Sequence, residues 1–136
     1  MMKGKILGVL MLSVLSLGFL SSVNARDTLP TSWSQKSPIF KVVSASEFKT
    51  LMEKKGIQLI DVRTPQEVGK GKIGNAKNLD FYGASFKSEL NKLDKTKPVL
   101  IYCQSGNRSG QAVNMMKSMG FTEVYDLKGG WGAWPK

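Results

Sequence analysis

The sequence contains no histidine and only one cysteine among its 136 residues. Without histidine, the chain can form neither a Ser-His-Asp triad nor a Cys-His pair, and it offers no imidazole to a metal ion. With one cysteine, it can form no internal disulfide, no CxxC redox pair and no thiolate zinc site. It also has no nucleotide-binding motif, so we expect no cofactor. Any nucleophile must be activated without a histidine base.

Acidic residues are also few. Ten Asp and Glu stand against 20 Lys and Arg, which gives a net charge of +10. The basic residues form no run or stripe, so we interpret most of them as a solvated surface. The excess of positive charge favours small anions as partners, with an anionic membrane surface as the alternative. The length allows one domain, which we expect to be a monomer.

The first 25 residues have the layout of a secretory signal peptide. Lys3 and Lys5 precede a run of 15 apolar and small residues at 6–20, and a small-x-small pattern ends at Ala25. The run is shorter than the about 20 residues that span a bilayer. We predict a signal peptide at 1–25, cleavage after Ala25 and export to the periplasm or an equivalent compartment. An uncleaved N-terminal anchor is the alternative.

Export bears on the partners of the mature chain. Nucleic acid is a poor partner outside the cytoplasm, and after cleavage we expect no stable insertion into the membrane. Residues 26–39 are polar, contain two prolines and show no periodicity, which predicts an extended lead-in before a domain at 40–136.

Residues 40–136 alternate short apolar runs with helical patterns. We expect strands at 40–43, 57–62, 76–79, 98–102 and 123–127, and helices at 45–55, 65–68, 85–93 and 109–119. The run at 98–102 is apolar at every residue, which is typical of a strand buried on both faces of a parallel sheet. This order predicts an α/β domain with a central, mainly parallel five-stranded sheet flanked by helices.

Cys103 directly follows this apolar run and opens a polar segment. Ligands of open α/β sheets bind beyond the carboxyl ends of the strands, so the thiol should lie at the mouth of a crevice. Gly106 lets the backbone amides turn inward as an anion nest, and the next helix points its N-terminus there. Arg108 adds a positive charge, so we expect a lowered pKa for the Cys103 thiol. The alternative is a small buried hydrophobic residue.

Three separated motifs resemble the rhodanese family: DVRTPQE at 61–67, CQSGNRS at 103–109 and GGWGAW at 129–134. The resemblance spans residues 40–134. Together with the signal peptide, it is greatest to the small single-domain periplasmic rhodaneses of the phage-shock type. It implies a rhodanese-like fold and a thiosulfate sulfurtransferase. Cys103 would take the outer sulfur of thiosulfate or a similar small anionic donor, and cyanide or a thiol would accept it from the persulfide.

The resemblance also implies roles for individual residues. Cys103 would be the catalytic residue. The residues that bind the substrate and the persulfide would be Gln104, Ser105, Gly106, Asn107, Arg108 and Ser109. Asp61 and Arg63 would form ion pairs that support the loop and the mouth, with an ordinary structural salt bridge as the alternative. For the whole chain, the alternatives are a non-enzymatic sulfane-sulfur carrier and an anion- or protein-binding module.

The chain departs from the family pattern in two places. Lys72 and Gly74 stand where many members have histidine and proline, and Gln104 stands where arginine is frequent. The missing arginine predicts weaker binding of thiosulfate. The loop from Cys103 to Arg108 has six residues. The Cys-based phosphatases of the same fold use one more to enclose phosphate, which disfavours that activity here.

Overall fold

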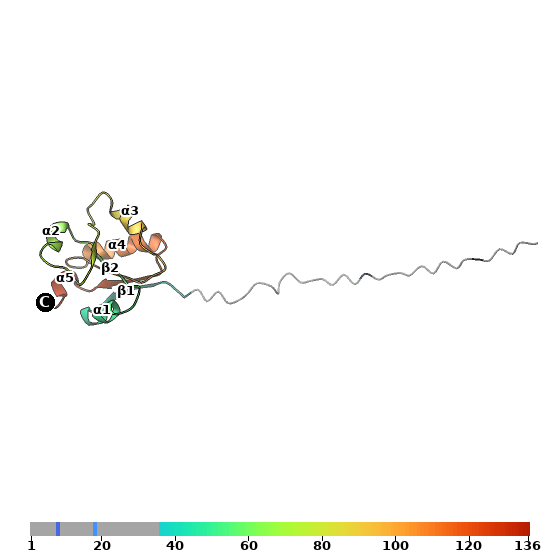
Figure 1. Cartoon of the computed structure of the whole chain (residues 1–136), viewed down its shortest axis with the longest axis horizontal. Helices are drawn as coiled ribbons and strands as arrows, with labels where there is room; N and C mark the ends of the chain where they lie inside the picture. Colours follow the sequence, from blue (N-terminus) through green and yellow to red (C-terminus); the bar gives the residue numbers. More distant parts are fainter. Residues whose placement is uncertain (1–7, 9–17, 19–35) are drawn as a thin grey trace, which may run out of the picture. The chain divides into compact units, whose positions relative to one another are not determined.

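The computed structural model describes Gly8, Gly18 and residues 36–136 (Figure 1). The predicted signal peptide, its cleavage site after Ala25 and most of the predicted lead-in lie outside the described residues. Within the part of the chain that is described, no helix is long and apolar enough to cross a membrane.

Five strands form one sheet in the order β1-β5-β4-β2-β3. Their bounds are β1 Ile39–Val43, β2 Gln58–Asp61, β3 Lys77–Asn78, β4 Val99–Tyr102 and β5 Glu123–Leu127. Every strand pair is parallel. The structure therefore confirms the predicted α/β fold. It also confirms that the all-apolar run is a strand buried on both faces, because all four residues of β4 are buried, and β4 is the central strand of the sheet.

The helices are α1 Ala45–Met52, α2 Pro65–Val68, α3 Phe86–Asn91, α4 Asn107–Ser118 and α5 Gly130–Ala133. Several predicted helix ends are wrong. The third helix spans 86–91 instead of 85–93, and the fourth ends at Ser118 instead of Met119. The first helix stops at Met52 instead of Lys55, because residues 53–56 bury no side chain that would hold a further turn. The fourth helix begins at Asn107 instead of Ser109, because Gly106, with φ +103°, already caps it.

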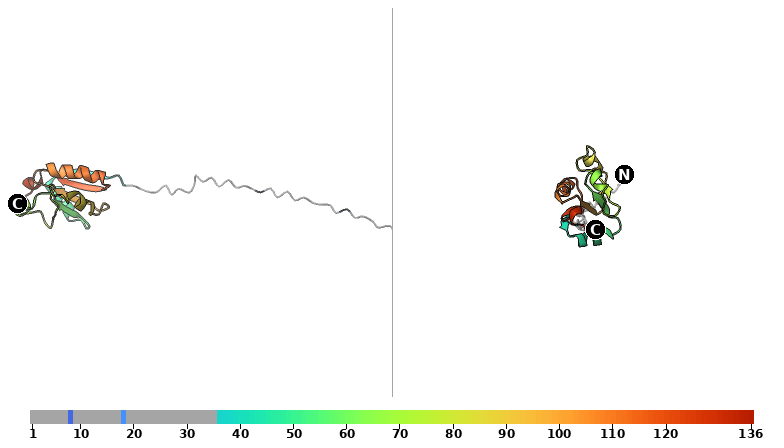
Figure 2. Two further views of the ribbon diagram at one scale, coloured as in Figure 1. Left: turned by 90° about the horizontal axis from the view of Figure 1, so that it is seen from above. Right: turned by 90° about the vertical axis from the view of Figure 1, so that its left-hand side faces the viewer.

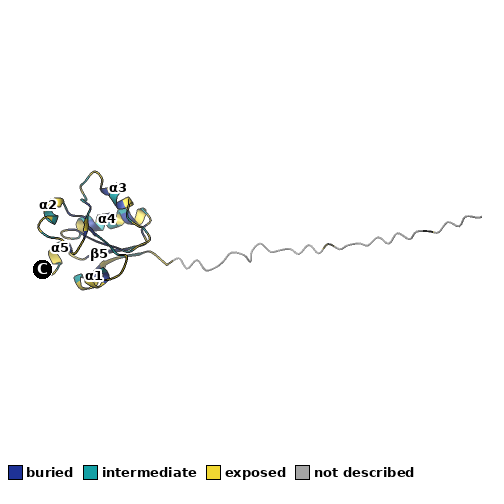
Figure 3. Cartoon of the chain, viewed as in Figure 1, coloured by how far each residue is buried: buried dark blue, intermediate teal, exposed yellow. Residues whose placement is uncertain are grey.

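Helices cover both faces of the sheet. One face packs against α3 and α4, and the other packs against α1 and α5 (Figure 1). In Figure 2, α4 runs alongside β5. Buried residues gather along the strands and exposed residues on the outer sides of the helices (Figure 3). Each face thus has its own apolar core, and apolar burial of this kind supplies most of the stabilisation.

The parallel arrangement sets the position of the functional residues. Because all five strands point the same way, their carboxyl ends meet at one edge of the sheet. Strand β2 delivers Asp61 and Arg63 to this edge, and β4 delivers Cys103. Strand β5 leads there into the turn at Gly129 and the short helix α5.

Candidate active site

Cys103 follows β4 directly and is only 1% exposed. Its carbonyl oxygen accepts a hydrogen bond from the Trp131 amide at 2.8 Å. The Gln104 carbonyl oxygen accepts one from the Gly132 amide at 3.0 Å. The start of α5 therefore holds the backbone on which the thiol is carried, which joins two of the three motifs noted in the sequence.

Gly130 makes this close approach of two backbones possible. Its φ of +60° is in the left-handed region, and a Cβ there would overlap the Cys103 carbonyl oxygen and lie 2.8 Å from the Gln104 carbonyl oxygen. A larger residue would have to push the backbone of the cysteine loop aside. The second glycine of the GGWGAW motif is thus required by the geometry of the loop.

The sulfur lies in a cradle of hydrogen-bond donors. The Gly106 amide donates to Sγ at 3.0 Å, and the Ser109 hydroxyl donates at 3.5 Å. Burial acts to raise the pKa of the Cys103 thiol. Hydrogen bonds from the Ser109 hydroxyl and from the amides of Ser109, Gly106 and Ser105 outweigh this, so the pKa is lowered. This is the direction predicted from the sequence, whereas burial in apolar surroundings alone would raise the pKa.

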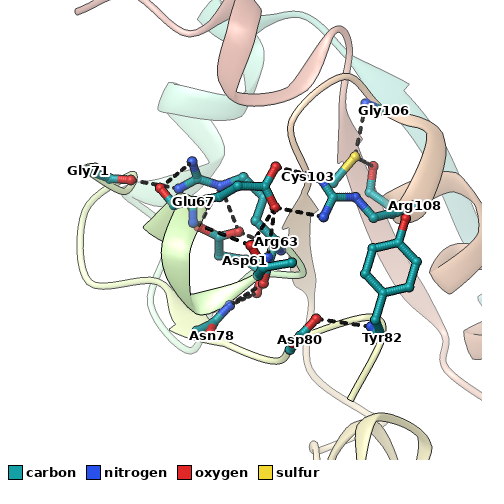
Figure 4. A network of polar contacts seen from close by, with 12 residues as sticks. Asp61, Arg63, Glu67, Gly71, Asn78, Asp80, Tyr82, Cys103, Gly106 and Arg108 are labelled. Atoms are coloured by element: carbon teal, nitrogen blue, oxygen red, sulfur yellow. Dashed lines mark hydrogen bonds and ion pairs between the residues drawn. The ribbon is translucent and has the colours of Figure 1, made fainter. Parts of the chain in front are cut away.

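Arg108 does not present a free charge to the sulfur. Its guanidinium makes two hydrogen bonds to the Glu67 carboxylate, at 2.8 and 2.7 Å, and lies over the Tyr82 ring (Figure 4). The pairing with Arg108 lowers the pKa of Glu67 to about 2, and pairing with Glu67 raises the pKa of Arg108. The positive charge expected to hold an anion is therefore directed at a carboxylate. What it anchors is the start of α4 to α2.

Glu67 was not among the residues predicted from the sequence. It is the third residue after Thr64, and the two form a capping box at the start of α2. The three-residue spacing of Thr64 and Glu67 is a sequence signal for the start of a helix. The partner Arg108 lies 41 residues away, so the ion pair could not be inferred from local spacing.

The Glu67–Arg108 pair should make stability depend on pH. Because the pKa of Glu67 falls from 4.5 unfolded to about 2 folded, its contribution is complete above about pH 5 and is lost as the pH falls toward 2. Each pKa unit is worth about 1.4 kcal/mol, and solvent screens this partly exposed pair. We therefore expect Glu67→Gln to cost about 2 kcal/mol at pH 7.

Urea unfolding of the wild type and Glu67→Gln between pH 7 and pH 3 measures this effect. The two free energies of unfolding should differ most at pH 7 and converge as the pH falls. A gap that stays constant over the whole range would contradict the assigned role of the ionised carboxylate.

Asp61 and Arg63 pair with each other. Both side chains are buried, and Arg63 Nη2 lies 2.7 Å from Asp61 Oδ2. Burial opposes the charge on Arg63, but the hydrogen bonds to Asp61 outweigh it and raise the pKa of Arg63. Arg63 also donates to the carbonyl oxygens of Glu67 and Gly71 and lies over the Trp131 ring, 4.6 Å from its centre. These contacts hold the Arg63 guanidinium against α2, the loop at Gly71 and α5.

The remaining predicted residues lie on the outside of the loop. Gln104, Ser105 and Asn107 have exposed side chains. Lys72 donates to the Ala76 carbonyl oxygen within its own loop, at 3.3 Å. Their side chains make no hydrogen bond to Sγ in the described part of the chain, so the backbone of the loop forms the cradle.

Two more residues at this edge were missed. Asn78 on β3 donates to the carbonyl oxygens of Asp61 and Arg63, at 2.9 and 2.8 Å, and so fixes the end of β2. Asp126 on β5 is a buried carboxyl next to the loop. Its signal was present in the sequence as an acidic residue between the apolar neighbours Tyr125 and Leu127. Among residues 36–136, no group of three or more Cys, Asp or Glu side chains could hold a metal ion.

Comparison with known proteins points to one family. Residues 44–136 match the family described as Rhodanese-like domain. A Coxiella burnetii protein named thiosulfate sulfurtransferase GlpE is 35% identical over 96 residues, which are 71% of this chain and 88% of that protein. An Allochromatium vinosum protein named sulfurtransferase is 32% identical over the same shares of the two chains. The crystal structure of a rhodanese-like domain protein from Staphylococcus aureus matches with a TM-score of 0.63 and 32% identity, over 71% of this chain and 93% of that one.

Proposed function

The chain belongs to the rhodanese-like domain family, and we propose that it is a thiosulfate sulfurtransferase that carries sulfur on Cys103 as a persulfide. The observation that carries the proposal is the cradle of donors around Sγ, at the carboxyl end of the central strand. The names of the curated relatives support the reaction class.

The first half of the reaction loads the enzyme. The Cys103 thiolate attacks the outer sulfur of thiosulfate, a new S–S bond forms at Sγ, and the S–S bond of thiosulfate breaks. Its electron pair leaves with sulfite. A thiolate and a dianion give a persulfide anion and a dianion, so charge and atoms balance without an oxidant.

The second half returns the enzyme to its starting state. Cyanide or a thiolate attacks the terminal sulfur of the persulfide, and the electron pair of the broken S–S bond returns to Sγ. With cyanide, the product is thiocyanate. The reaction therefore moves one sulfur atom through a covalent intermediate and needs no cofactor.

The cradle stabilises charge where it develops. The terminal persulfide sulfur is anionic, and the loop amides of Ser105, Gly106 and Ser109 are donors already oriented toward the sulfur. Because Cys103 is almost fully buried, a donor has to reach it end-on with a slender group. The one-atom terminus of thiosulfate meets this requirement. Arg108 acts by holding α4 against α2 through Glu67.

Steady-state kinetics with thiosulfate and cyanide test the proposal. We expect thiocyanate to form in multiple turnovers, with initial-rate plots against one substrate that stay parallel as the other is varied. This is the ping-pong pattern of a covalent intermediate. No thiocyanate above the uncatalysed rate, or intersecting plots, would contradict the proposal. Absence of turnover would favour the sulfur-carrier alternative.

We further propose that residues 1–25 direct export and are removed after Ala25, as in the phage-shock type of rhodanese. Removal takes two lysines and leaves 18 basic and 10 acidic residues, a net charge of +8. The test is the mass of the protein recovered from the periplasm of a bacterial host. A chain that begins at Arg26 supports export, whereas a full-length chain confined to the cytoplasm contradicts it.

A further inference from the structure

Asp126 lies on the same sheet face as the thiol. In the pairing of β4 with β5, it stands opposite Ile101, and Cys103 is two residues beyond Ile101. Because side chains alternate along a strand, Ile101 and Cys103 belong to one face, the face that α4 covers. Asp126 is 5% exposed, and its Oδ1 makes no hydrogen bond. Burying a carboxyl oxygen without a hydrogen-bond partner costs free energy.

Ser109 is near both the sulfur and Asp126. It is fully buried in the first turn of α4, and its hydroxyl donates to Sγ at 3.5 Å. The hydroxyl also acts to lower the pKa of the Asp126 carboxyl, although these two described side chains form no hydrogen bond with each other. The turn lies close above this carboxyl, since a Cβ added at Gly110 would be 3.9 Å from Asp126 Oδ2. A hydroxyl has one proton, so Ser109 cannot serve both acceptors fully at once.

We propose that Asp126 is a positioning residue that acts on Cys103 through Ser109, and that its protonation decides which acceptor the Ser109 hydroxyl serves. A protonated Asp126 donates to Ser109 Oγ and leaves the hydroxyl proton for Sγ. An ionised Asp126 draws that proton to itself, and its charge opposes the nearby thiolate. The consequence for sulfur transfer rests on the function proposed above, while the hydrogen-bond exchange does not depend on it.

The surroundings of Asp126 shift its protonation toward neutral pH. Burial raises the pKa of Asp126 to about 6, although the Ser109 hydroxyl and the Leu127 amide partly oppose the shift. A cavity of about 170 Å³ borders Asp126 and is lined by Lys117 of α4 and Lys41 of β1. Lys41 pairs with Tyr125, so its side chain belongs to the opposite face of the sheet, and the charged group that faces Asp126 across the cavity is Lys117. On its other side, beyond Ser109, is the thiol of Cys103. The cavity is large enough to admit water, which gives the carboxyl a route for proton exchange.

Asp126→Asn tests the proposal with little change of shape. The Asn amide donates to Ser109 Oγ at every pH, as the protonated acid does. The readout is the thiolate of Cys103, followed by its ultraviolet absorbance as the pH is raised; no other cysteine interferes. We expect the wild type to titrate over a broadened range that reflects Asp126. We expect the variant to titrate in one step, with the thiol pKa lower by about half a unit or more and about threefold more thiolate at a fixed pH below it.

Two controls separate an effect of Asp126 that passes through Ser109 from a general effect of its charge. Glu123→Gln removes a negative charge from the other end of β5, and it should leave the thiol titration unchanged. In a Ser109→Ala background, Asp126→Asn should lose most of its effect. Superimposable titrations of the wild type and Asp126→Asn, or an effect as large without Ser109 as with it, would overturn the proposal.

A further measurement keeps the test decisive if Asp126→Asn does not fold. Ser109→Ala alone should raise the thiol pKa and reduce the broadening due to Asp126, whereas an unchanged broadening would overturn the proposal. Thiol titration needs no sulfur donor. A protein that shows the predicted titrations but forms no thiocyanate would therefore contradict only the proposed function.

Discussion

Cys103→Ser is expected to abolish sulfur transfer and to leave the fold intact. A serine hydroxyl cannot take up sulfur as a persulfide, so the covalent route is closed. We expect the rate of thiocyanate formation to fall at least about a thousandfold, as is usual when a covalent nucleophile is removed. The fold should tolerate the change, because the hydroxyl is nearly the same size and can accept the hydrogen bond that the Gly106 amide gives to Sγ.

Thiocyanate assays and thermal unfolding of the purified variant check both parts. The matched control is Ser105→Ala, which changes an exposed side chain of the same loop and keeps its backbone amide. It should retain most of the activity. If Cys103→Ser transferred sulfur at a rate near that of the wild type, the persulfide mechanism would be wrong.

Asp61→Ala is expected to have the largest effect on stability. Arg63 is 1% exposed and pairs with Asp61 at 2.7 Å. Removal of the carboxylate leaves a guanidinium buried without its counter-charge. Breaking a buried pair in this way typically costs about 3–5 kcal/mol. Since domains of this size are stable by about 5–15 kcal/mol, the variant should unfold at a much lower urea concentration.

The double variant Asp61→Ala/Arg63→Met tests the cause of this loss. It removes both charges and keeps an apolar side chain in the space of Arg63, so it should be clearly more stable than Asp61→Ala alone. Urea unfolding of the wild type, the two single variants and the double variant gives the coupling energy. Simple additivity of the two single effects would show that the pair contributes little, contrary to the structure.

The strands and the nucleophile could be predicted because their signals are local. The run at 98–102 is apolar at every residue, which marks a strand buried on both faces, and the polar residues after it mark where the strand leaves the core. The sequence therefore predicts Cys103 at the carboxyl edge of the sheet, where the structure has it. The predicted start of this helix, Ser109, is two residues later than the observed start of α4 at Asn107. The reason is that Gly106 belongs to the loop and also caps the helix.

The partners of the charged residues could not be predicted in the same way. Arg108 pairs with Glu67 across 41 residues, and this depends on how α2 packs beside α4. The proposed link from Asp126 through Ser109 to Cys103 depends on the pairing of β4 with β5 in the sheet. Sequence spacing fixes neighbours along one element, whereas these contacts come from the topology, in which distant segments meet at the carboxyl edge.

The roles of the two arginines follow from these partners. A guanidinium that is already bound to a carboxylate holds the fold together and leaves little charge for a ligand. Arg63 binds Asp61, and Arg108 binds Glu67. In the proposed reaction, the stabilisation of the persulfide is therefore assigned to the backbone amides of the loop, which have no counter-charge beside them.

Intact mass spectrometry of the purified protein tests the persulfide on Cys103 most directly. The protein is measured before treatment, after thiosulfate, and again after cyanide. We expect a gain of the mass of one sulfur atom with thiosulfate, its loss with cyanide, and no gain in Cys103→Ser. An unchanged mass after thiosulfate, or an equal gain in Cys103→Ser, would contradict the persulfide mechanism.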